Sequence, residues 1–178
     1  MKARAAFEAE LFSHAGFVIL PGVVHPTFVA ECKSLIEVIK ERDWTYGNQT
    51  RHKWREYGRP RLLPLSRALD SALLGAACPG RIVRQFQWVN LFEQGQFVER
   101  HKDAGGDAHL LIPIEVPSRA DGGQFWLEHK RSVLPVGVGD ALLVRADAIL
   151  HGTTAITSVG GRRITFNTRL WFSPDDGK

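Results

Sequence analysis

The residues best suited to metal chemistry are His101 and Asp103, separated by one residue, and His151, much later in the chain. Side chains two residues apart on an extended strand point to the same face, so His101 and Asp103 can project together. A histidine from a later strand can then complete a triad of two histidines and one carboxylate. Such a triad suits iron(II) and leaves coordination positions open for a co-substrate and oxygen. We therefore take these three residues as candidate metal ligands and catalytic residues.

A second signal is the strand-like stretch that starts near Arg162 and carries Arg163, Thr165, Asn167 and Arg169 on one face. The opposite face is mainly apolar. An arginine that points into a protein interior is costly unless an anion meets it, and its planar fork suits a carboxylate. The alternation favours Arg163 over Arg162 as the inward-facing arginine. A His-x-Asp tripeptide alone is weak evidence, and this downstream strand makes it specific.

The composition indicates a soluble globular protein with a single domain over residues 1–178. The hydrophobic fraction is 44% and the charged fraction 24%, as in ordinary globular domains. No apolar run approaches the ~20 residues of a membrane helix, and the first residues lack the features of a secretory signal. We therefore expect a cytoplasmic protein without membrane contact. The net charge of +4 mildly favours anionic ligands and does not by itself indicate nucleic acid. Cys32 and Cys78 are expected to be separate, reduced thiols.

The order of the expected elements is helices first and strands afterwards. A short strand at 16–20 precedes a helix that begins near Pro26, and a second amphipathic helix is expected from 65 to 77. Residues 1–80 are thus expected to be mainly helical, and residues 81–173 to form a jelly-roll core. The expected strands of this core are 81–92, 109–116, 123–128, 133–136, 141–144, 148–153 and 162–172.

The segment from Asp43 to Pro60 is polar and aromatic, and it has no clear periodicity. A connection of this length without regular structure is often functional, commonly as a lid over a site. An ordinary solvated loop is an equally good interpretation. Both readings stay open at the level of the sequence.

On these residues the chain resembles the 2-oxoglutarate/Fe(II)-dependent dioxygenases, in particular their small prolyl-hydroxylase-like or phytanoyl-hydroxylase-like members. The strand at 16–20 before a helix, the Gly122-Gly123 pair and the strand at 139–144 are also similar to that family. The resemblance implies an α+β fold, a double-stranded β-helix (a cupin-like jelly roll) with N-terminal helices packed on its outside. It also implies iron(II), 2-oxoglutarate and O2 as cofactor and co-substrates.

The same resemblance implies roles for individual residues. His101, Asp103 and His151 would bind the iron, and the 2-oxoglutarate-binding residues would be Arg163, Thr165, Asn90 and Arg169. Asn90 lies in an Asn-Leu-Phe sequence where some members have Asn-x-Tyr, so Phe92 removes one hydroxyl contact. The implied reaction is hydroxylation or another oxidation of an unactivated C–H bond, with release of succinate and CO2. The carboxylate of Asp103 favours this over halogenation, because related halogenases lack it.

The substrate is less well defined by the sequence. Arg84, Trp88 and Trp126 are candidate substrate-binding residues, which suits a small molecule with an acidic group, such as an amino acid or a natural-product intermediate. The aromatic residues could equally be core. One alternative function is AlkB-type demethylation of nucleic acid, suggested by the basic-aromatic segment 51–61, although the modest charge makes nucleic acid a poor candidate. Another is a cupin-like metal-binding or binding-only protein. The sequence does not indicate the oligomeric state.

Overall fold

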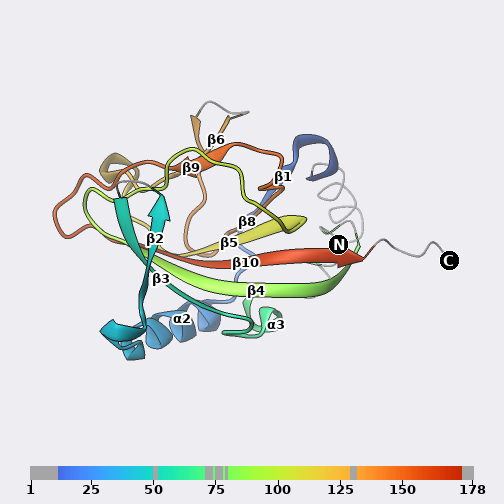
Figure 1. Ribbon diagram of the computed structural model, residues 1–178, viewed down its shortest axis with the longest axis horizontal. Coiled ribbons are helices and arrows are strands. Elements are labelled where there is room, and N and C mark those ends of the chain that lie inside the picture. The colour runs from blue at the N-terminus through green and yellow to red at the C-terminus, as the bar shows by residue number, and fades with distance from the viewer. Residues whose placement is uncertain are drawn as a thin grey trace.

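The chain folds into two antiparallel sheets that face each other (Figure 1). The structure, a computed structural model, describes residues 12–49, 52–70, 74, 78, 80–128 and 132–173. The large sheet has the order β1 (Phe17–Leu20), β8 (Ala141–Val144), β5 (Ala108–Glu115), β10 (Arg163–Ser173), β4 (Arg81–Phe92), β3 (His52–Arg59) and β2 (Thr45–Gln49). The small sheet has the order β7 (Ser132–Val133), β6 (Phe125–Leu127) and β9 (His151–Thr153).

Helices cover the outer face of the large sheet. Figure 1 shows α2 (Pro26–Val38) and α3 (Leu65–Ala68) on the side of this sheet that faces away from β6 and β9. Single 3₁₀ turns occur at Glu41–Asp43 and Arg119–Asp121. Pro26 at the start of α2 has a fixed φ that suits the first helical turn. Within the described residues, none of the helices has both the length and the apolar character needed to span a membrane.

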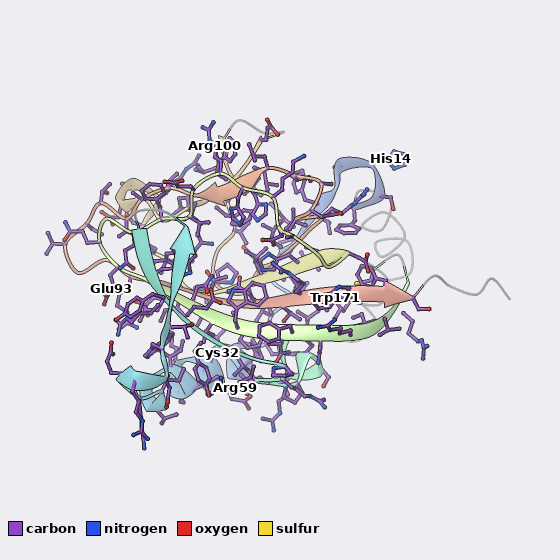
Figure 2. The ribbon with its side chains drawn as sticks, in the orientation of Figure 1. His14, Cys32, Arg59, Glu93, Arg100 and Trp171 are labelled. Carbon is purple, nitrogen blue, oxygen red and sulfur yellow. The ribbon has the colours of Figure 1, made fainter. Side chains whose placement is uncertain are left out.

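The core is divided by the large sheet, because successive side chains on each strand face opposite sides. On the helix side, Phe28 of α2 meets Phe166 of β10 edge to face, with ring centroids 5.1 Å apart. Cys32 belongs to the same cluster and lies on α2 beneath the sheet (Figure 2). A second cluster fills the space between the two sheets and includes Phe125 and Leu127 of β6. The cavity of the candidate site opens beside this second cluster.

Most of the expected strands are confirmed, and two have the predicted bounds. Strands β4 and β8 occupy residues 81–92 and 141–144 as expected, and β5 and β10 are shifted by one residue. The antiparallel two-sheet architecture predicted from the sequence is therefore confirmed. The two cysteines are free and buried, and burial raises the pKa of both thiols to about 12.

The described residues of the segment 43–60 are mainly strand, so the expectation of a connection without regular structure was wrong. Its residues form the hairpin of β2 and β3, and β3 pairs with β4 from Arg55↔Leu91 to Arg59↔Gln87. The mainly helical N-terminal part thus also contributes strands to the sheet. Charged residues on both faces of β3 concealed its alternation. Trp54 and Glu56 line the cavity, whereas Arg55 forms ion pairs outside it with Glu41 and Glu93.

The expected helix from 65 to 77 is also interrupted. Leu69 has an extended backbone (φ −152°, ψ 160°), and α3 ends at Ala68. Leu69 is fully buried in the helix-side cluster, so tertiary packing outweighs the helical spacing of the apolar residues. Leu74 is helical, while residues 71–73 and 75–77 of the expected helix lie outside the described residues.

Replacement of Phe28 by alanine tests the packing of α2 on the sheet. Phe28 is fully buried, so the Phe28→Ala variant should lose about 3–5 kcal/mol of unfolding free energy through lost contacts and a cavity. Urea denaturation followed by far-ultraviolet circular dichroism measures this loss. Val38, which is 72% exposed on the same helix, provides the control: Val38→Ala should change the free energy by less than about 0.5 kcal/mol. Equal effects of the two substitutions would contradict the assigned packing.

Candidate functional site

His101 and His151 are held opposite each other by the backbone. They form an isolated antiparallel bridge in which each amide N–H donates to the other residue's carbonyl, at 2.9 Å in both directions. The Asp103 amide donates to the Ala146 carbonyl at 2.8 Å, which fixes the residue two positions later. The segment after β4 is thereby attached to the start of β9. This attachment explains how His101 and Asp103 meet His151, which lies much later in the sequence.

The three side chains present their metal-ligating atoms to a common position. One ligand atom from each of His101, Asp103 and His151 lies within 4.8 Å of the others. Nδ1 of His101 is 2.9 Å from the Glu99 carbonyl, and Nδ1 of His151 is 2.9 Å from the Ile149 carbonyl. Because a carbonyl can only accept, each Nδ1 must carry the proton, which leaves each Nε2 with a lone pair for a metal.

The protonation states also suit a divalent cation. Burial lowers the pKa of His151 to about 4, so its imidazole is neutral at pH 7. Burial alone would raise the pKa of Asp103, but His101, His109 and the charge of Arg169 outweigh it and hold this pKa well below its usual range. Burial would likewise lower the pKa of His101, yet the Asp103 carboxylate and the Glu99 carbonyl raise it overall. A cation between these groups would favour the neutral imidazoles.

Asp103 is oriented from its outer side by two further residues. Its Oδ2 lies 3.0 Å from Nη2 of Arg169 and 3.3 Å from Nδ1 of His109. Its Oδ1 lies 3.4 Å from Nε2 of His101. Oδ2 also lies 3.9 Å from Nε2 of His151, so this oxygen is shared by Arg169, His109 and His151, whereas Oδ1 faces His101. The sequence predicted Arg169 as a 2-oxoglutarate-binding residue; in the structure it lines the cavity and contacts Asp103, and the co-substrate role stays a prediction.

Arg163 is a buried cation without an acidic partner. Its side chain is 4% exposed, and its Nε donates to Thr165 Oγ1 at 3.1 Å and its Nη1 to the Gly123 carbonyl at 2.9 Å. No carboxylate forms an ion pair with Arg163 in the described part of the chain. Burial lowers its pKa to about 10, so it is still charged at neutral pH. The turn requires glycine at position 122, because its φ is positive and a Cβ there would clash with the Ala155 carbonyl oxygen.

Both sets of residues line one cavity of about 250 Å³. Phe125 connects them: its ring stacks on His151 at 5.9 Å, and the Arg163 guanidinium lies 5.9 Å from the same ring. The polar face that the sequence predicted for β10 also lines the cavity. Its members there besides Arg163 are Thr165, Asn167 and Arg169. Asn90 is present in the wall, and its buried Oδ1 has no hydrogen-bond partner among the described residues.

Two of the three predicted substrate residues lie outside this cavity. Arg84 stacks on Trp171 of β10, and a bulge in the pairing of β4 and β10 directly follows that position. Trp126 is covered by Arg100 at 4.2 Å and faces away from its neighbours Phe125 and Leu127, which point into the core. Figure 2 shows Arg100 and Trp171 well apart. Trp88 does line the cavity, at 4.9 Å from the His109 ring.

The sequence interpretation missed several wall residues. Trp54 and Glu56 come from β3, for which the sequence did not predict a strand. Phe125 lies next to Trp126, the residue that the sequence predicted on β6. His109 is the first residue of β5 that faces the cavity, and no signal in the sequence identified it. The strand is almost entirely buried on both faces, so its alternation is not visible in the sequence.

Comparison with solved structures supports the architecture. A Pseudomonas putida prolyl-4-hydroxylase superposes with a TM-score of 0.75 over 95% of this chain and 99% of its own, at 11% identity. An oxidoreductase of the 2OG-Fe(II) oxygenase family from Burkholderia pseudomallei has a TM-score of 0.73, with coverage of 96% and 92%, at 16% identity. The chain has the 2-oxoglutarate/Fe(II) oxygenase fold. The predicted double-stranded β-helix is thus confirmed.

The oxygenase fold is also found in HygX from Streptomyces hygroscopicus, solved with nickel and 2-oxoglutarate bound. Its TM-score to this chain is 0.66, with coverage of 94% of this chain and 87% of its own, at 17% identity. No protein-family model matches the chain, and no curated protein matches it. At identities of 11–17%, the likeness establishes the oxygenase fold.

Removal of one candidate ligand should weaken metal binding strongly. In the His101→Ala variant, the affinity for Mn(II), measured by isothermal titration calorimetry, should fall by at least ~100-fold, because one of three protein ligands is lost. His25, an exposed residue at the N-terminus of α2, provides the control. His25→Ala should bind Mn(II) like the unmodified protein. Retention of Mn(II) binding by the His101→Ala variant would show that the ion is bound elsewhere.

Proposed function

We propose that this chain is an Fe(II)- and 2-oxoglutarate-dependent dioxygenase that hydroxylates, or otherwise oxidises, an unactivated C–H bond of a small molecule. Iron(II) would be held by His101, Asp103 and His151, and O2 would be consumed with release of succinate and CO2. The observation that carries the proposal is the position of Arg163. A buried, charged guanidinium that has no acidic partner among the described residues lines the same cavity as the metal triad.

The geometry around Arg163 suits one end of a dicarboxylate. A buried arginine is stable only where its charge and its donors are satisfied. Here Thr165 and the Gly123 carbonyl bind Nε and Nη1 and so fix the plane of the guanidinium. A ligand that chelates the metal at one end and carries a carboxylate at the other would supply the missing anion. 2-Oxoglutarate has this chemical form, and its carboxylate matches the arginine fork.

The metal triad fits an iron(II) ion in donor type and in number. Two imidazole nitrogens and one carboxylate oxygen are the donor set of the non-haem iron oxygenases, and His101, Asp103 and His151 would supply it. A bound iron(II) would couple the oxidative decarboxylation of 2-oxoglutarate by O2 to the oxidation of a substrate C–H bond. Arg169 and His109 keep Asp103 ionised and oriented. The comparisons lend support, since HygX has this fold and was solved with nickel and 2-oxoglutarate bound.

The other cavity residues would position the reactants and exclude water. Phe92 and Phe125 flank the Arg163 guanidinium at 6.0 Å and 5.9 Å. Their rings strengthen its interaction with a carboxylate by keeping solvent away. Asn90 remains a candidate contact of the co-substrate, with Thr165 as its partner across β4 and β10. The small cavity volume favours a small molecule, or a single side chain of a larger one, as the substrate.

The role of Arg163 can be tested by co-substrate binding. The Arg163→Met variant should bind 2-oxoglutarate at least ~10-fold more weakly in the Ni(II)-loaded protein, since a charge-assisted hydrogen-bonded contact is lost. Isothermal titration calorimetry measures this affinity. Arg162 is the matched control, because it lies on the opposite face of the chain and is exposed beside Glu115. Arg162→Met should bind 2-oxoglutarate as the unmodified protein does.

Two outcomes would favour other functions. If the metal-loaded protein binds no 2-oxoglutarate, the proposal fails and a cupin-like metal-binding or binding-only protein becomes the better description. Salt-sensitive binding of oligonucleotides would favour AlkB-type demethylation. The structure offers that reading little support, because Arg55 is engaged by Glu41 and Glu93 and Arg59 stacks on Tyr57. Binding of 2-oxoglutarate without oligonucleotide binding is the result that we expect.

A further inference from the structure

One charged side chain in the cavity has no role in the metal or co-substrate site. Apart from histidines, the charged residues that line the cavity are Arg163, Arg169, Asp103 and Glu56. Arg163 is assigned to the co-substrate, and Arg169 lies against Asp103, the proposed ligand. Glu56 forms no ion pair within the described part of the chain. It therefore remains in the cavity wall as an acidic group without an ion-pair partner among the described residues.

The position of Glu56 separates it from the co-substrate. Glu56 on β3 is the register partner of Asn90 on β4, and Asn90 is the partner of Thr165 on β10. Neighbouring strands are about 4.8 Å apart, so the backbones of Glu56 and Thr165 are separated by roughly 10 Å. The Glu56 carboxylate would repel the co-substrate carboxylates, which face Arg163 and the metal. It is thus placed to meet another molecule.

The surroundings of Glu56 suit a cation. Trp54 precedes it on the same face of β3. Phe86 and Trp88 precede Asn90 on the cavity side of β4. Trp88 and Phe86 have ring centroids 6.1 Å apart, and Phe86 is 36% exposed. A glycine at position 58 leaves room for Phe86, because a Cβ there would lie 3.1 Å from its ring. Aromatic faces beside a carboxylate attract organic cations.

Hydrogen-bonding capacity points the same way. The buried Oδ1 of Asn90, directly across from Glu56, is an acceptor without a partner among the described residues. An acceptor and a carboxylate side by side call for a ligand that brings donors. Burial raises the pKa of the Glu56 carboxyl, although the Trp54 indole and the charge of Arg169 act in the opposite direction. A cationic ligand would favour the ionised carboxylate.

We propose that the substrate of this cavity carries a protonated amine, which Glu56 binds and the rings of Trp54, Phe86 and Trp88 surround. This inference rests on the proposed function, because the metal and 2-oxoglutarate define which part of the cavity remains for substrate. It replaces the expectation of an acidic substrate group, which depended on Arg84. Arg84 does not line the cavity, and the arginines that do so among the described residues are Arg163, assigned to the co-substrate, and Arg169, which pairs with Asp103.

The test compares two small probes that differ in charge and are similar in shape. 4-Fluorobenzylamine is protonated at pH 7, and 4-fluorobenzyl alcohol is neutral. Their affinities for the full chain, loaded with Ni(II) and 2-oxoglutarate, are measured by fluorine-19 NMR titration. The amine should bind roughly 10-fold more tightly than the alcohol, because one charge-assisted hydrogen bond is gained. The Glu56→Gln variant should lose that preference and bind the alcohol unchanged.

Two controls separate this inference from other roles of Glu56. Glu115→Gln removes a carboxylate that pairs with Arg162 outside the cavity, and it should keep the preference for the amine. Titration of 2-oxoglutarate into Glu56→Gln should give an affinity within about twofold of the unmodified protein. A changed 2-oxoglutarate affinity with an intact amine preference would show that Glu56 serves to balance Arg169, and would overturn the inference.

Equal binding of amine and alcohol, or no binding of the amine at millimolar concentration, would also overturn it. Failure of the proposed function gives a different pattern, in which 2-oxoglutarate does not bind the metal-loaded protein. The comparison of the two probes is then repeated with Ni(II) alone. A Glu56-dependent amine preference under that condition would keep the amine site and reject the oxygenase.

Discussion

Strand β10 has to satisfy two environments at once, and the site depends on how it does so. It lies between β4 and β5 in the centre of the large sheet, and its side chains alternate between the helix-side core and the cavity. Ile164 and Phe166 face α2, whereas Arg163 and Thr165 face the cavity. A shift of the register by one residue would place a guanidinium in the apolar core. The fold and the position of the candidate co-substrate arginine are therefore fixed by the same pairing.

The charged groups of the cavity comprise one paired set around Asp103 and two groups, Arg163 and Glu56, that form no ion pair among the described residues. Oδ2 of Asp103 contacts Arg169 and His109, and its Oδ1 faces His101. Arg163 is buried without an acidic partner and Glu56 forms no ion pair, in each case among the described residues. These two groups of opposite charge are on strands separated by β4. They do not neutralise each other, and each is available to a different ligand. The proposed co-substrate and the proposed cationic substrate follow from this separation.

The sequence predicted the parts of the fold and site that depend on local alternation. The face of β10 and the bounds of β4 could be derived because polar and apolar residues alternate or change at turns. The hairpin β2–β3 could not, since its two faces are both polar in sequence and only one is buried in the cavity wall. Glu56 was missed for the same reason. Arg84 lies outside the cavity although Trp88, on the same strand, lines it. Alternation along a strand predicts which face a residue is on, and it does not predict how far along the strand the site lies.

A crystal structure of the chain with Ni(II) and 2-oxoglutarate bound under anaerobic conditions would test the central claim most directly. The account predicts metal on Nε2 of His101 and His151 and on one oxygen of Asp103. It also predicts that the far carboxylate of 2-oxoglutarate pairs with Arg163, whose side chain keeps its contact with Thr165. A metal at the triad with the carboxylate bound by another residue, or with 2-oxoglutarate absent at saturating concentration, would contradict it.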